Sequence, residues 1–570
     1  MLDLVIRNGL VVDGTGRPGQ RADVGINLGR IVAVGRVADT ARETIDAEGH
    51  VVSPGFIDSH THMDAQMHWD PLGSSSCWHG VTSVVMGNCG FTLAPSRPNE
   101  REFIVRNFER SEDIPGPAMM TGIPWSWETF PEYLDVIDRL PKGINYAANI
   151  GHSALRTWVM GEDAFDREAT DDEIARMALP LRAALKAGAI GFSTSRQHHE
   201  TPDDKPVASR LAAWSEVERL VGAMGEAGAG VFQIAIEKVA RVADPALRRE
   251  FLARMRALAV ASRVPFTFGI LPMGESREAW EDQLDLLDSV AAAGGRIFGQ
   301  SHSRGASVLL SFRSALPFDR LPEWRPIRAL PFDEQARLLR DPATRERLIQ
   351  AAHHGDYGRP VGAEPFKPDY DLLRVHTGPL PPYPTVAEAA AARGVDPVAL
   401  MIDLALATGF RQFFIQPAGG YAFAEADVLK IMRHPRTIMT FSDAGAHVSQ
   451  IADFSIQTYL LSYWARERRQ FTLEKAVQMM TEVPARAWGF DDRGALRVGM
   501  AADVNVFDFE RLNPGMPELV ADLPTGAQRL IQKPQGFLAT IVGGRVTLRK
   551  GEATGALPGK LLRGPLARSS

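Results

Sequence analysis

The chain has 570 residues, a mass of 62.3 kDa and a formal net charge of −6 at pH 7. This length suits one large barrel with accessory parts better than a single small core. The acidic balance leaves no basic footprint for nucleic acid, and no apolar run reaches the roughly 18 residues that a membrane helix needs.

Cysteine usage and the N-terminus indicate a cytoplasmic protein. Cys77 and Cys89 are the only cysteines, so a disulfide framework is excluded and a reducing compartment is expected. Residues 1–8 read as a strand and lack the basic start and long apolar core of a signal peptide. We therefore expect neither a membrane nor a nucleic-acid partner.

The first 53 residues consist of short apolar segments separated by Gly, Asn and Asp turn signals, which predicts strands. From about residue 54 the pattern changes to apolar strands alternating with amphipathic helices, which is typical of a parallel α/β barrel. Eight barrel strands are predicted at residues 51–60, 81–86, 144–152, 189–193, 231–237, 265–270, 297–300 and 437–443. Helices are predicted at residues 171–186, 214–227, 245–262 and 279–293.

The seventh and eighth strands are separated by an unusually long segment, residues 303–436. It contains charged helical stretches and a connection rich in proline (Pro379, Pro381, Pro382 and Pro384). Long insertions in compact domains are usually functional, so we interpret this segment as a lid or subdomain over the barrel mouth.

Short strands like those of the N-terminus are predicted again after a helical stretch at residues 472–480. A turn and an apolar strand occupy residues 494–508, and residues 542–546 resemble a hairpin. Neither chain end has enough strands for a stable sheet alone. Residues 1–53 and 490–555 are therefore predicted to form one discontinuous β-sandwich domain, and residues 54–489 the barrel.

His60 and His62 end the first predicted barrel strand. Side chains at i and i+2 point to the same side of a strand, so the two imidazoles can bind one divalent metal together. Their neighbours are apolar, and burial without a ligand would leave ring nitrogens without partners. The pair therefore favours a metal site over a solvated face.

Other polar residues also follow the carboxyl ends of predicted strands: Cys89, His152, His302 and Asp443. In an α/β barrel these ends converge on the face that carries the active site. Structural alternatives remain: Asp443 as a helix N-cap, Cys89 as a small buried apolar residue, and His152 bonded to backbone. The tandem pair at residues 198–199 is expected in a loop rather than as ligands.

Several motifs resemble one known family. Residues 54–62, with Pro54, Gly55, His60 and His62, resemble the first metal motif of the amidohydrolase superfamily. Residues 87–91 are similar to the N-acyl-D-amino-acid deacylase (D-aminoacylase) branch, in which a cysteine replaces the usual lysine carbamate as a ligand. Residues 151–156 and 441–447 also match that branch. Residues 499–503 resemble the closing β-sandwich motif of the superfamily.

This resemblance implies a (β/α)8 TIM-like barrel, joined by a small β-sandwich domain built from both chain ends. It implies one firmly bound Zn²⁺ held by His60, His62, Asp443 and Cys89, although such ligands accept other divalent metals. Asp443 would accept the proton of the attacking water and pass it to the departing amine. His152 would help to polarise the scissile carbonyl.

The sequence departs from the branch at the second metal position. D-aminoacylases place histidines on strands five and six, but strand five here offers Gln233 and Glu237, and strand six only Thr267. A second metal site is therefore doubtful. Glu237, Gln233 and His302 remain candidates for metal or substrate binding. Arg156, Arg196 and Arg304 are candidates for a substrate carboxylate, with a structural ion pair as the alternative for each.

The sequence thus predicts a metal-dependent hydrolase that deacylates an N-acyl (D-)amino acid or a related small amide, with that amide as its small-molecule partner. A cyclic amide or imide hydrolase of the dihydropyrimidinase or hydantoinase type is disfavoured, since the fourth strand carries no lysine. A lactone or ester hydrolase and a non-catalytic scaffold stay open. A homo-oligomer is expected only from the frequency of symmetric oligomers.

Overall fold

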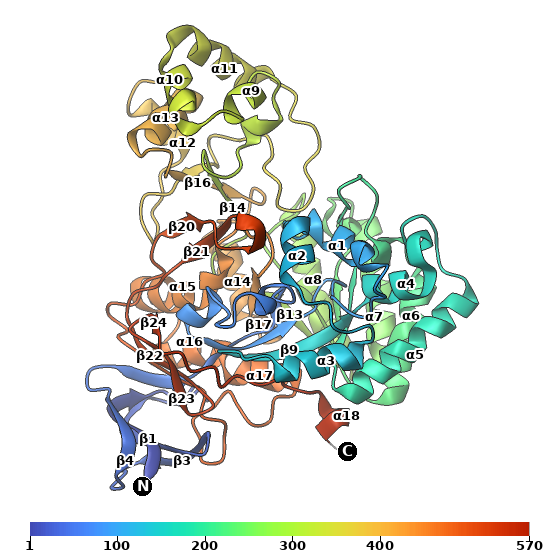
Figure 1. Cartoon of the computed structure of the whole chain (residues 1–570), viewed down its shortest axis with the longest axis vertical. Coiled ribbons are helices and arrows are strands. Elements are labelled where there is room, and N and C mark those ends of the chain that lie inside the picture. Colours follow the sequence, from blue (N-terminus) through green and yellow to red (C-terminus); the bar gives the residue numbers. More distant parts are fainter. Residues whose placement is uncertain (569–570) are drawn as a thin grey trace.

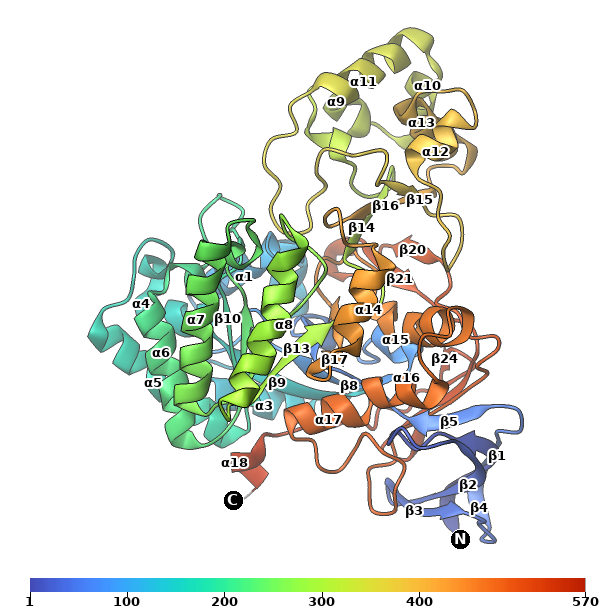
Figure 2. The same cartoon turned by 180° about the vertical axis from the view of Figure 1, so that it is seen from behind.

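The computed structural model describes residues 1–568. A helix-covered barrel forms its centre, strands from both chain ends lie at one side, and a helical insertion projects from the other (Figure 1). The view from behind shows the same three parts, with helices α5 to α8 along the outside of the barrel (Figure 2).

The barrel sheet is parallel throughout. Within residues 1–568 it has eight strands in the order β17-β13-β12-β11-β10-β9-β8-β6. Their bounds are β6 (Phe56–Asp58), β8 (Val81–Met86), β9 (Asn145–Gly151), β10 (Gly191–Ser195), β11 (Val231–Ala235), β12 (Phe266–Gly269), β13 (Ile297–Ser301) and β17 (Thr437–Met439). The order follows the chain and each strand matches a predicted one, so the TIM-like barrel prediction is confirmed.

The first predicted strand is divided, which corrects its assignment to the barrel alone. β5 (Val51–Pro54) pairs with the sheet of the chain ends, and the barrel strand begins after Gly55. A Cβ atom at Gly55 would lie 2.1 Å from Thr82 Oγ1 on β8. Only glycine permits this close approach, so the chain passes from one sheet to the other at this residue.

The barrel closes where the first and eighth strands end. β7 (His60–Thr61) pairs in parallel with β18 (Phe441–Ala444), and His60 lies opposite Phe441. The hydroxyls of Ser59 and Thr440 are 2.8 Å apart, and the His62 N–H donates to the Ala444 carbonyl at 2.7 Å. These bonds bring the two ends of the barrel sequence together at the carboxyl edge of the strands.

Amphipathic helices cover the barrel. α5 (Asp171–Ala187), α6 (Trp214–Ala227), α7 (Pro245–Ser262) and α8 (Arg277–Ala292) lie within two residues of their predicted bounds. The structure adds α1 (Arg101–Glu109), α2 (Gly116–Gly122), α3 (Phe130–Arg139) and α4 (His152–Met160). It further contains α14 (Glu425–Arg433), α15 (Ile456–Tyr459), α16 (Leu473–Met480), α17 (Glu482–Trp488) and α18 (Pro565–Arg568). In the described part of the chain, no helix is long and apolar enough to cross a membrane.

Both chain ends contribute to a second sheet, whose order across the described residues is β24-β23-β22-β19-β5-β1-β2-β3, with β4 paired to β1. N-terminal strands are β1 (Leu2–Val11), β2 (Gln20–Asn27), β3 (Arg30–Gly35) and β4 (Ala41–Asp46). C-terminal strands are β19 (Val504–Phe507), β22 (Phe537–Val542), β23 (Arg545–Arg549) and β24 (Glu552–Ala553), while β20 (Pro517–Val520) pairs with β21 (Arg529–Gln532). We propose that residues 1–53 and 490–555 form one domain around this shared sheet.

The insertion has a hydrophobic core of its own around Trp324, Leu348 and Phe414. A small antiparallel sheet joins it to the barrel, with strands β14 (Ser307–Ser311), β15 (Arg374–Val375) and β16 (Phe413–Pro417). Its helices are α9 (Arg325–Arg328), α10 (Phe332–Arg340), α11 (Pro342–His354), α12 (Val386–Ala391) and α13 (Pro397–Ala407).

A buried ion pair ties the shared sheet to the barrel. Asp503 Oδ2 accepts hydrogen bonds from Arg493 Nη1 at 2.5 Å and from Asn145 Nδ2 on β9 at 3.1 Å. Its Oδ1 accepts the Gly543 N–H at 2.8 Å, in the hairpin turn between β22 and β23. Both charged side chains are only 6% exposed, so neither can recruit water if the other is lost.

We expect Asp503→Ala to lower the free energy of unfolding by about 3 kcal/mol, because Arg493 would remain buried without its carboxylate. Urea denaturation measures this change. The control is Asp492→Ala, which removes a 46% exposed partner of the same arginine and should cost less than about 1 kcal/mol. Equal losses in the two variants would contradict the assignment.

Candidate active site

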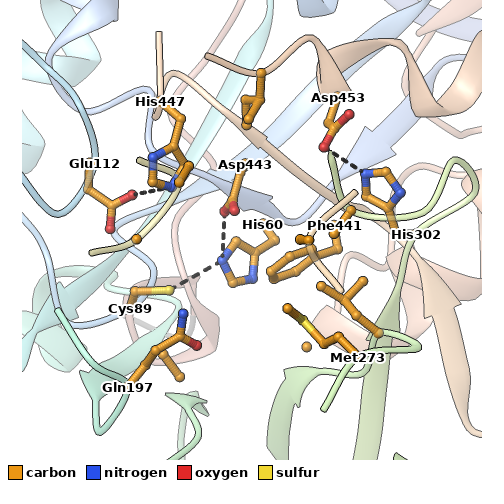
Figure 3. Close-up of a pocket in the computed structure, with 18 of the residues that line it drawn as sticks. His60, Cys89, Glu112, Gln197, Met273, His302, Phe441, Asp443, His447 and Asp453 are labelled. Atoms are coloured by element: carbon orange, nitrogen blue, oxygen red, sulfur yellow. Dashed lines mark hydrogen bonds and ion pairs between the residues drawn. The ribbon is translucent and has the colours of Figure 1, made fainter. Parts of the chain in front are cut away.

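Four side chains converge at the barrel closure. His60 Nε2 lies 3.2 Å from Asp443 Oδ1, and His62 Nε2 lies 3.4 Å from the same oxygen. Cys89 Sγ, on the loop after β8, is 3.4 Å from His60 Nε2. Figure 3 shows Cys89 and Asp443 both directed at the His60 ring. We refer to these four residues as the metal cluster.

Two members of the metal cluster adopt left-handed backbone conformations. Cys89 has a φ of 53° and Asp443 also has a φ of 53°, which non-glycine residues rarely adopt. The Cys89 N–H donates to Gln233 Oε1 at 2.7 Å, which fixes the loop against strand β11. Gly445, with a φ of 92°, lets the chain pass the His62 carbonyl, which a Cβ would approach to 2.6 Å. These constraints aim the thiol and the carboxylate at the imidazoles.

The metal cluster fits a divalent cation. His62 Nδ1, His62 Nε2 and Asp443 Oδ1 are buried and make no well-formed hydrogen bond within the described residues. Burial lowers the pKa of His62, so its imidazole is neutral and can act as a ligand. Burial also raises the pKa of the Cys89 thiol, and a nearby cation would stabilise the thiolate that zinc prefers.

Asp443 remains ionised in this setting. Burial opposes its charge, but the adjacent His60 and His62 imidazoles hold its pKa well below the usual range. An ionised carboxylate beside two imidazoles and a cysteine forms a mixed N, O and S ligand set, which suits zinc.

Gln300 on β13 orients the His60 ring through Nδ1, the nitrogen that does not face the metal cluster. Its Oε1 lies 2.5 Å from His60 Nδ1, so the ring donates there and presents the unprotonated Nε2 to the metal cluster. The sequence analysis did not identify Gln300, because a glutamine within a buried strand carries no distinguishing pattern.

The sequence analysis also missed Glu112, His447 and His199, which line the same cavity. Glu112 Oε2 lies 3.7 Å from both His62 Nε2 and His447 Nε2. Burial, with the Asp443 charge adding to it, raises the pKa of Glu112 well above its ordinary value, which favours the neutral acid. His447 belongs to the 441–447 motif, whereas Glu112 follows helix α1, for which no pattern was found. His199 lies in the loop after β10, as predicted, and is buried and bonded to Ser195 Oγ at 2.9 Å.

His152 and Arg156 lie outside the metal cluster. His152 begins helix α4, and both of its ring nitrogens are engaged, with Thr194 Oγ1 and Glu216 Oε1, each at 2.8 Å. Arg156 Nη1 donates to Glu216 Oε2 at 2.5 Å. The catalytic role of His152 and the substrate role of Arg156 stay predictions that this fully buried network does not favour.

The other arginine candidates and His302 also face protein partners rather than the metal cluster. Arg196 Nε pairs with Glu237 Oε1 at 3.1 Å, and Arg304 Nη1 donates to Ser455 Oγ at 2.6 Å. His302 lines the cavity but faces Asp453, with Nε2 at 3.2 Å from Oδ2 (Figure 3).

Strands five and six provide no second group of ligands. Across the described residues, His60, His62 and Cys89 are the only set of at least three His, Cys, Asp or Glu side chains whose ligand atoms lie within 4.8 Å of one another. Gln233 on β11 contacts Cys89 and lines the cavity, whereas β12 carries the apolar residues Phe266 and Phe268 around Thr267.

The metal cluster opens into a cavity of about 170 Å³. The insertion forms part of its wall through residues 362–364 and Phe366, and the barrel loops supply Ile236, Arg241 and Met273. A metal position at the closed end of a mixed polar and apolar cavity can hold one small substrate against an activated water.

A parallel barrel with histidine, cysteine and carboxylate ligands at the carboxyl ends of its strands defines a metal-dependent hydrolase. The amidohydrolase family profile matches residues 43–548. The chain belongs to the amidohydrolase family, and is an enzyme that acts on carbon–nitrogen bonds other than peptide bonds.

Several relatives that match over most of the chain are deacylases from one branch of this family. The chain is 30% identical to an N-acyl-D-aspartate deacylase from Alcaligenes xylosoxydans xylosoxydans, covering 98% of this chain and 95% of that protein. A D-aminoacylase from the same organism is 29% identical over 98% and 97%. The solved structure of the N-acyl-D-glutamate deacylase from Bordetella bronchiseptica, complexed with zinc and a phosphonate inhibitor, has a TM-score of 0.65 at 25% identity, covering 99% of each chain.

Cys89→Ser should weaken metal affinity roughly 100-fold, because a hydroxyl is a much poorer zinc ligand than a thiolate. Competition with a chromogenic chelator measures the affinity, and elemental mass spectrometry the metal content. Cys77→Ser, at a buried cysteine outside the metal cluster, is the matched control and should keep its metal. Unchanged affinity in Cys89→Ser would show that this thiol only packs.

Gln300→Leu should weaken metal affinity about 10- to 100-fold, because His60 would lose the acceptor that fixes its tautomer and orientation. Gln300→Glu restores an acceptor and should recover most of the affinity. A leucine variant that binds metal as tightly as the natural protein would contradict the orienting role.

Proposed function

We propose that this enzyme removes the acyl group from N-acyl-D-amino acids. The observation that carries the proposal is the metal cluster, His60, His62, Cys89 and Asp443, at the end of a cavity sized for one small amide. Similar proteins include an N-acyl-D-aspartate deacylase and an N-acyl-D-glutamate deacylase, which supports the choice of a linear amide and the D configuration.

His60, His62, Cys89 and Asp443 would hold the cation, with zinc as the expected metal. When bound, such an ion supplies Lewis acidity, which lowers the pKa of a water molecule and polarises an amide carbonyl. Gln300 holds the His60 ring through Nδ1. Burial lowers the pKa of His62, so this imidazole stays neutral and does not compete with Asp443 for a proton.

Asp443 is the proposed general base and acid. Its ionised carboxylate can accept the proton of the attacking water and then deliver it to the nitrogen of the departing amino acid. The neighbouring Glu112 carboxyl favours its neutral form, so it adds little negative charge against the attacking oxygen. The apolar walls formed by Ile236, Leu271 and Met273 restrict water around the reacting bond.

The alternatives have less support. Strand β10 contains Gly191, Phe192, Ser193, Thr194 and Ser195, and so lacks the lysine that hydantoinase-type enzymes normally carbamylate. A non-catalytic scaffold has no physical need for buried, unpartnered ligand atoms such as those of His62. No feature of the cavity favours an ester or lactone over an amide.

We expect the zinc-loaded protein to release free amino acid from N-acetyl-D-amino acids, and Asp443→Asn to lower kcat by about 1,000-fold. Asparagine keeps an oxygen for the metal but cannot take up a proton. Chromatographic detection of the released amino acid gives kcat, and elemental mass spectrometry checks that the variant keeps its metal.

Removal of the metal with a chelator should abolish turnover, and zinc should restore it. N-acetyl-L-amino acids and hydantoins serve as comparison substrates. Faster turnover of hydantoins than of any N-acetyl-D-amino acid would overturn the proposal, as would full activity in Asp443→Asn with normal metal content.

A further inference from the structure

The cavity contains one cation that the proposed chemistry does not use. Arg241 lines the cavity from the short 3-10 helix η5 (Lys238–Arg241), between β11 and α7. Its guanidinium makes no hydrogen bond and no ion pair with any side chain of residues 1–568. Arg241 lines the same cavity as Cys89 and the other members of the metal cluster.

The acidic side chains that line the cavity all have partners elsewhere. Asp443 faces His60 and His62, and Glu112 faces His62 and His447. Asp453 faces His302, and Glu364 accepts a hydrogen bond from Arg110 Nε at 2.8 Å. None of these carboxylates neutralises Arg241.

An arginine in this position is costly for the fold. Burial lowers the pKa of Arg241 to about 10, so it stays protonated at neutral pH and keeps an uncompensated positive charge. Arg241 is half-buried, and charged groups that the fold leaves without a partner are retained mainly at functional sites. A guanidinium presents paired N–H donors that match the two oxygens of a carboxylate.

The backbone holds Arg241 in place. The Glu275 N–H donates to the Arg241 carbonyl at 2.8 Å, and Gln283 Nε2 donates to the adjacent Ala240 carbonyl at 3.3 Å. Ile236 and Met273 line the same cavity as apolar wall residues. The segment therefore holds the backbone of a cation in the wall of the cavity that contains the metal cluster, which contributes to the preorganisation that an anion subsite requires.

We propose that Arg241 binds the α-carboxylate of the substrate and thereby restricts the enzyme to N-acyl α-amino acids. This inference rests on the proposed deacylase function and assigns its specificity to one residue. The α-carboxylate is attached two bonds from the scissile nitrogen, so a cation that lines the same cavity as the metal cluster can bind it while the carbonyl lies at the cluster. A carboxylate at the end of a long side chain would lie farther from the cluster.

Kinetics with matched substrates test this assignment. N-acetyl-D-alanine carries the α-carboxylate, and N-acetyl-D-alaninamide replaces it with a neutral group of similar size. In the natural protein the acid should have a kcat/KM roughly 100-fold higher than the amide. Arg241→Met should remove this preference by raising KM for the acid about 100-fold, with kcat changed less than about threefold. Turnover of the amide should stay the same.

Two further variants complete the experiment. Arg241→Lys keeps the charge and should retain part of the preference for the acid. Lys238→Met removes an exposed cation from the same 3-10 helix and should behave as the natural protein. Metal content and the binding of both compounds, measured by titration calorimetry, accompany each variant, so a folding defect is recognised by its loss of metal.

The outcomes separate the two proposals. Equal loss of activity on acid and amide in Arg241→Met, with normal metal content, would overturn the subsite and leave the deacylase function intact. An unchanged preference in Arg241→Met would do the same. If the natural protein hydrolyses neither compound, the deacylase function fails. Calorimetry then decides the subsite: tighter binding of the acid that depends on Arg241 supports it, and its absence overturns it.

Discussion

The pairing of β7 with β18 is the interaction on which the site depends. It joins segments at opposite ends of the barrel sequence: Ser59 and Thr440, which bond to each other, are 381 positions apart. Closing the barrel there places the His60 and His62 imidazoles against the Asp443 carboxylate. Gly445 allows the chain to cross the His62 carbonyl, so the closure and the metal cluster are built by the same few residues.

Two groups in the cavity are left without a protein partner that satisfies them. The carboxylates face histidines or arginines, and burial keeps His62 and His199 neutral by lowering their pKa. What remains is a cluster of ligand atoms that attracts a cation and a guanidinium, Arg241, that attracts an anion. In a low-dielectric cavity both attractions are stronger than in water, and together they orient a molecule that carries a carbonyl and a carboxylate.

The sheet of the chain ends and the C-terminal tail contact the opposite ends of the barrel strands, whereas the insertion lines the cavity. β5 continues through Gly55 into β6, so the sheet of the chain ends and the barrel share one stretch of backbone. Asp503 bonds to Arg493, Asn145 and Gly543 across that junction, and the tail returns under the barrel, where the Leu562 N–H donates to the Tyr146 carbonyl at 2.7 Å. The chemistry at the carboxyl ends is thereby separated from the contacts that support the fold.

The sequence by itself determined the barrel, its strand order and the residues His60, His62, Cys89 and Asp443. Strand periodicity is local, and a ligand at a strand end is recognised by its position in that strand. Only the tertiary structure decided which other polar groups face the cavity. Glu112 follows a helix, Gln300 lies in a buried strand and Arg241 ends a short 3-10 helix, none with a distinguishing local pattern. His152 faces Glu216 instead of the metal cluster. Side-chain partners across elements are set by packing between distant segments, which no local spacing encodes.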